Sequence, residues 1–110
     1  MTYQHKQLAE SGWAKLSFFE QMANIGSEVI RAIKWRDKGR DDYASAASDR
    51  ALELLYLTID DPSNRHRLRE LCRLYETLAD YLYGDNQYCG DPEKISNYFL
   101  AFNYAARLSR

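Results

Sequence analysis

The side chains best suited to bind a metal ion or act as a nucleophile are few: His5, His66, Cys72 and Cys89. Metal sites in helical bundles use Glu-x-x-His pairs, and zinc sites use closely spaced cysteines and histidines. The chain has neither pattern, and it has no glycine-rich phosphate loop and no Gly-x-Ser-x-Gly sequence. We therefore predict no catalytic residue, no metal site and no cofactor, and we favour a non-enzymatic role.

The densest group of positive side chains is Arg65, His66, Arg67 and Arg69. It lies at the predicted start of a helix, where the helix dipole disfavours cations. Neighbouring carboxylates could offset that cost, or the group could be a candidate anion site that uses the free N–H groups of the helix end. The second basic run, 34–40, would lie at the opposite end of an antiparallel bundle, so nucleic-acid binding is less expected but stays open.

A second candidate surface follows the polar side of the predicted helix that ends near Lys38. On a helical wheel, Trp13, Glu28, Arg31 and Trp35 share this side, opposite a stripe of apolar residues. Because tryptophan and arginine dominate binding hot spots, we predict that these four side chains contact a protein partner.

Arg50 is the one cation that falls on a predicted apolar stripe. A buried arginine needs a carboxylate partner, and Glu28 and Glu76 are the candidates. We predict a buried polar network around Arg50 and Glu76 that fixes helix register; a small-ligand pocket at Arg50 is the alternative.

These side chains must be positioned by helices, since no segment alternates with the two-residue period of a strand. The first helix is predicted to begin between Tyr3 and Gly12, or at Trp13 behind a Ser11 cap, and to end near Lys38. The second is capped by Asp41 or Asp42 and ends near Asp60. Two more are predicted: one over 65–83, and one that begins at Asp91-Pro92-Glu93, where a cap residue precedes proline.

The 110 residues are sufficient for one domain, 1–110, which we predict to be an all-α, four-helix up-and-down bundle. The second and fourth helices are apolar around most of their circumference. A lone bundle of this size cannot cover both, so we expect the chain to self-associate, most simply as a homodimer.

Composition narrows the class further. The net charge of −1 gives no overall attraction to nucleic acid or to an acidic membrane. The first twelve residues lack the apolar region of a signal peptide, and no apolar run is long enough to span a bilayer. We expect a cytoplasmic protein with reduced thiols and no membrane association.

Three resemblances bear on the function. Residues 39–43 and 50–54 resemble half of a tetratricopeptide repeat, but their spacing is two residues short and no second copy exists, so we do not assign that family. The runs MANIGSEVIRAIKW, RALELLYLTID and RLRELCRLYE resemble small, uncharacterised bacterial all-helical proteins, which implies no activity or site. The size and helix pattern are similar to HEPN-type proteins, which include RNA-cleaving toxins.

HEPN-type cleavage requires an arginine four to six residues before a histidine, and no arginine precedes His66 at that spacing. The resemblance therefore implies an alternative, RNA binding or toxin–antitoxin association through Arg65–Arg69, without cleavage. Our leading interpretation is a self-associating bundle that mediates protein–protein interaction.

Overall fold

The computed structural model describes residues 12–108, and its first element is a short 3-10 helix, η1 (Trp13–Lys15). The first long helix, α2 (Phe18–Asp37), begins only at a capping box: Ser17 Oγ accepts from the Glu20 amide, and Glu20 Oε1 accepts from the Ser17 amide, both at 3.1 Å. The predicted start at Trp13 is wrong because this box starts a new helix at Phe18. The predicted start between Tyr3 and Gly12 mostly lies outside the described residues.

The second long helix, α3 (Asp41–Asp60), ends where predicted and begins at Asp41, the earlier of the two residues predicted to cap it. Gly39 ends α2 with a φ of +74°, a conformation that glycine adopts without strain. The predicted cap is wrong, because Arg40 holds the N-cap position and Asp41 and Asp42 lie in the first turn. Both carboxylates still face the positive end of the helix dipole.

The third predicted helix is two elements, the 3-10 helix η2 (Pro62–Arg67) and α4 (Leu68–Tyr83). Its end is correct and its start is wrong, because Asp61 caps a 3-10 turn that precedes α4. The last helix, α5 (Pro92–Leu108), begins as predicted: Asp91 Oδ1 accepts from the Glu93 amide at 2.8 Å, and proline holds the first helical position.

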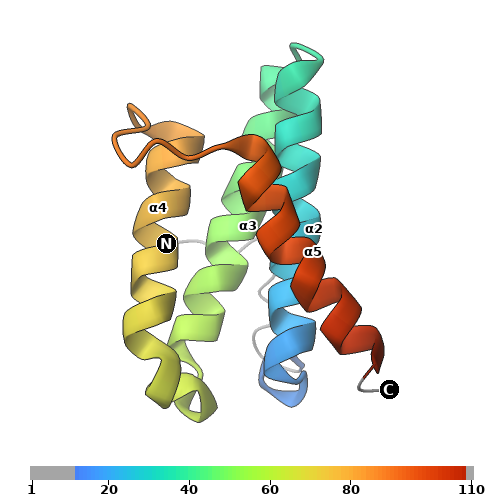
Figure 1. Cartoon of the computed structure of the whole chain (residues 1–110), viewed down its shortest axis with the longest axis vertical. Helices are drawn as coiled ribbons and strands as arrows, with labels where there is room; N and C mark the ends of the chain where they lie inside the picture. The colour runs from blue at the N-terminus through green and yellow to red at the C-terminus, as the bar shows by residue number, and fades with distance from the viewer. Residues whose placement is uncertain (1–11, 109–110) are drawn as a thin grey trace.

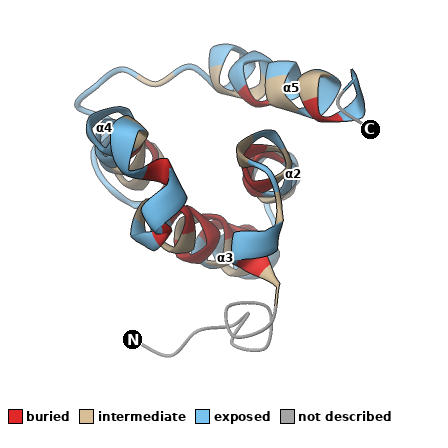
Figure 2. Ribbon diagram, turned by 90° about the horizontal axis from the view of Figure 1, so that it is seen from below, coloured by how far each residue is buried: buried red, intermediate tan, exposed pale blue. Residues whose placement is uncertain are grey.

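The helices that pack against each other run antiparallel, and the all-α prediction is confirmed (Figure 1). α2 lies between α3 and α5, whereas α4 packs on the other side of α3. The segment 84–91 therefore has to span from α4 to α5, which do not pack closely against each other (Figure 2). The described helices include none with the length and hydropathy needed to cross a bilayer.

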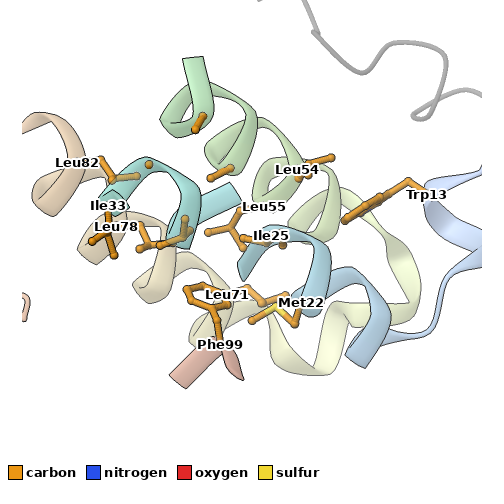
Figure 3. Packing of buried hydrophobic residues seen from close by; sticks show 14 residues of the cluster. Trp13, Met22, Ile25, Ile33, Leu54, Leu55, Leu71, Leu78, Leu82 and Phe99 are labelled. Atoms are coloured by element: carbon orange, nitrogen blue, oxygen red, sulfur yellow. The ribbon is translucent and has the colours of Figure 1, made fainter. Parts of the chain in front are cut away.

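One core fills the space between the helices, and Figure 3 shows its side chains converging from all four. α2 contributes Met22, Ile25 and Val29, all fully buried. Gly26 lets α5 approach so closely that a Cβ at this position would lie 2.5 Å from Phe99 Cβ. This contact fixes the position of α5 on α2.

The two helices predicted to carry surplus apolar surface behave differently. For α3 the prediction is wrong, because α2, α4 and η1 cover it, and Ala47, Ala51, Leu54 and Leu55 are nearly inaccessible. For α5 the prediction of uncovered apolar surface is confirmed. Only Phe99 and Ala106 of α5 are buried, and most of the helix is exposed or half-buried (Figure 2).

Candidate functional site

Trp13, predicted to face a partner, lies in the core with 3% of its surface exposed. The helix break at Leu16 and Ser17 removes it from the helical phase of α2, so the prediction that it shares the polar side of that helix is wrong. Its indole Nε1 donates to Thr58 Oγ1 on α3 at 3.1 Å. Trp13 therefore fastens η1 to α3 and is not available to a partner.

A buried polar network that the sequence analysis missed surrounds Trp13. Gln21 Nε2 donates to the Trp13 carbonyl at 3.0 Å and to Asp61 Oδ2 at 3.1 Å, and Asn64 Nδ2 donates to Gln21 Oε1 at 3.0 Å. Burial alone would raise the pKa of Asp61, but its hydrogen bonds from Gln21 and Ser63 lower that pKa below the ordinary 3.8. The sequence signal for this network was Gln21, a polar residue on the apolar side of α2. The network holds η1, α2 and η2 together, so its role is structural.

Glu28, Arg31 and Arg50 form one chain of ion pairs on the seam between α2 and α3. Arg50 Nε lies 3.0 Å from Glu28 Oε2, and Arg31 Nη1 lies 3.1 Å from Glu28 Oε1. Glu28 is thus the partner predicted for Arg50. The predicted pairing of Arg50 with Glu76 is wrong, because Glu76 lies on the exposed side of α4.

Trp35 lies beside this seam and takes part in a stack that we call the aromatic turn, since it surrounds the turn from α2 to α3. The Trp35 and Tyr43 rings lie 4.7 Å apart, Lys38 Nζ lies 5.4 Å from the Trp35 ring, and Arg40 Cζ lies 4.3 Å from the Tyr43 ring. Sequence reasoning missed Tyr43 as a candidate surface residue; it is 46% exposed.

The four predicted anion-binding residues do not act together. Arg65, His66 and Arg69 are exposed, whereas Arg67 is half-buried with its guanidinium Cζ 4.1 Å from the centre of the Phe18 ring. Arg67 Nε is buried without a hydrogen-bond partner. Because Arg67 packs on Phe18, only the other three of the four predicted side chains are exposed to contact an anion.

Among the described residues, the two most exposed large apolar side chains are Tyr104 and Leu108. Together with Leu100 and Ala101 they form what we call the outer face of α5. Leu100 is 48% exposed, Tyr104 66% and Leu108 69%. Residues 95–106 include no charged side chain on any side of the helix. An uncharged stretch of this length in a helix at the protein surface is unusual, since exposed helix faces are normally polar or charged.

An apolar pocket of about 260 Å³ lies between α4 and α5, on the side of α5 that carries Phe99. Leu74 and Leu78 line it from α4, and Ile95 and Phe99 from α5. Tyr98 also lines the pocket, and its burial, together with the nearby charge of Glu70, raises the pKa of the Tyr98 hydroxyl above its ordinary value. The pocket is therefore separate from the outer face of α5, since none of the four outer-face residues lines it.

Two further observations concern clusters and hollows elsewhere on the described surface. Within residues 12–108, no three His, Cys, Asp or Glu side chains gather closely enough to hold a metal ion. The polar hollow between α2 and α5, about 270 Å³, is lined mainly by small and amide side chains, with Glu20 and Arg107 as its charged groups.

Comparison with known protein families, curated proteins and solved structures finds no match to this chain. The resemblances to bacterial helical proteins and to HEPN-type proteins stay predictions.

Proposed function

We propose that this protein is a non-enzymatic interaction protein that self-associates through the outer face of α5. The observation that carries the proposal is an exposed helix whose residues 95–106 include no charge. Leu100, Tyr104 and Leu108 repeat every four residues on it and form a continuous apolar stripe. Water contact over such a stripe is unfavourable by about 25 cal/mol per Å², and association with a second apolar surface removes that cost.

A second copy is the simplest partner, because most soluble oligomers are symmetric assemblies of one chain. The stripe lies on the far side of α5 from Phe99 and Ala106, so pairing through it would leave the core contacts intact. The chain also has only a small net charge of −1, so two copies do not repel each other strongly.

A second surface supports contact with a different protein. The ion-paired seam of Glu28, Arg31 and Arg50 continues into the aromatic turn through Trp35, and Arg31 is about half exposed. This surface combines arginine and tryptophan, the residue types that dominate hot spots. It lies on α2 and α3, away from α5, so a dimer could still bind a partner there.

Sedimentation velocity of the wild type and two variants tests self-association. Tyr104→Glu places a charge in the stripe and should leave a species of 12.9 kDa at concentrations where the wild type shows twice that mass. Tyr88→Glu is the matched control, because Tyr88 is a similarly exposed tyrosine, 63%, on the loop before α5. A wild type of single mass throughout, or equal effects of both variants, would overturn the proposal.

A further inference from the structure

Glu93 and Arg107, near the two ends of α5, lie at equal distances from Leu100 along the chain. Glu93 lies seven residues before Leu100 and Arg107 seven residues after it. Seven residues turn an α-helix by 700°, only 20° short of two full turns, so the three side chains lie almost on one line. Each charge is about 10.5 Å from Leu100 along the axis.

Glu93 and Arg107 are both exposed, and neither side chain forms an ion pair with another described residue. Leu100 between them is half exposed. Along this side of α5, an acidic side chain is therefore followed by an apolar one and then by a basic one.

Such a line is complementary to itself only when a second copy runs in the opposite direction. With a two-fold axis at Leu100, Glu93 of each copy faces Arg107 of the other, and the two Leu100 side chains meet at the axis. A parallel pair would instead place Glu93 against Glu93 and Arg107 against Arg107, which is repulsive.

The same register places the remaining stripe residues against suitable neighbours. Leu108 of one copy lies opposite Pro92 of the other, and Tyr104 lies opposite Ser96. An interaxial distance of about 9 Å and a crossing angle near 20° keep the ends of the two helices within reach of arginine and glutamate side chains.

We infer that the protein forms an isologous dimer in which two α5 helices pack antiparallel about Leu100, with reciprocal Glu93–Arg107 ion pairs at both ends; this rests on the proposed function. At 17 residues, α5 is about 25 Å long and presents a strip about 12 Å wide. The area of that strip is less than half of the roughly 800 Å² that each partner buries in a standard interface. The dimer is accordingly weak, with a Kd of about 10–100 µM.

Charge reversal tests the register. Glu93→Arg alone and Arg107→Glu alone each turn two attractive pairs into two repulsive ones and should weaken dimerisation about 5- to 30-fold. The double variant restores opposite charges and should return to within about 3-fold of wild type. An equimolar mixture of the two single variants should form mixed dimers more tightly than either variant alone. Glu76→Arg, the same change on the exposed side of α4, is the control and should have no effect.

Disulfide trapping gives a second measurement, with Cys72 and Cys89 replaced by serine. Leu100→Cys should form a cross-linked dimer because the two residues meet at the axis. Leu108→Cys should not, because antiparallel packing separates the two copies of this residue by about 24 Å along the axis. Circular dichroism confirms that each variant is folded.

The outcomes separate the two proposals. A wild type that dimerises, with a double charge reversal that fails to restore affinity or with cross-linking at Leu108, overturns the antiparallel register and leaves the proposed function standing. A wild type that stays a single copy overturns both.

Discussion

Replacing Gly26 with alanine tests how closely α2 and α5 pack. The added Cβ would lie 2.5 Å from Phe99 Cβ and 2.9 Å from Phe99 Cγ, whereas carbon atoms pack comfortably at about 3.5–4 Å. Phe99 is 1% exposed, and its Cβ cannot rotate away, so α5 has to move by about 1 Å. This position therefore sets the spacing of the two helices.

Two effects oppose each other in this variant. Alanine in place of glycine stabilises a helix by about 1 kcal/mol, and overpacking a core costs about 3 kcal/mol at the upper end of its usual range. We expect a net loss of about 2 kcal/mol, or about 8 °C in Tm for a chain of this size.

Urea unfolding followed by circular dichroism at 222 nm measures the change. Ser27→Ala, one residue later on the exposed side of α2, is the control and should be neutral or slightly stabilising, because it has the same helical context without the contact. A Gly26→Ala protein as stable as wild type would refute the close packing of α5 on α2.

Two further substitutions test polar side chains that pack at the margin of the hydrophobic core. Asp61→Asn should cost about 1–3 kcal/mol at pH 7, because an amide N–H replaces one acceptor oxygen in the hydrogen bonds from Gln21 and Ser63. Because the pKa of Asp61 in the folded protein lies below 3.8, its carboxylate stabilises the folded state above about pH 4, and this stabilisation is lost as the pH falls through the folded pKa. The urea midpoint of the Asn variant should therefore fall less on acidification than the midpoint of the wild type. Arg67→Lys should lower the melting temperature by removing a stacked guanidinium worth about 1 kcal/mol, while Arg65→Lys, at an exposed position, leaves it unchanged; equal melting temperatures would contradict the assignment.

Helix positions could be predicted where the signal is local. The backbone preferences of Asp91-Pro92-Glu93 favour the start of a helix, and those of Gly39 favour the end of one. As these residues indicate, α5 begins at Pro92, and α3 begins shortly after Gly39. The start of α2 was predicted too early because Phe18 and Phe19 continue the apolar pattern across the break. The capping box of Ser17 and Glu20 was the local signal that identifies the true start.

Contacts between distant segments could not be read from the pattern. The periodicity of α5 marks Phe99 and Ile95 as inward, but it does not say that α5 packs on α2 and leaves a pocket against α4. The ion pair of Arg50 with Glu28 was among the predicted pairings, because a cation on an apolar stripe needs a nearby carboxylate. Trp13 was misplaced because its burial depends on Thr58, 45 residues away.

The most direct test of the central claim is a concentration series of two-dimensional amide NMR spectra, from about 20 µM to about 1 mM, which brackets a weak dimer. We predict that the amides of residues 93–108 shift with concentration, whereas those on the exposed side of α4, such as Arg73 and Glu76, do not. Spectra that are unchanged over the whole range, or shifts confined to α4, would contradict the role assigned to the outer face of α5.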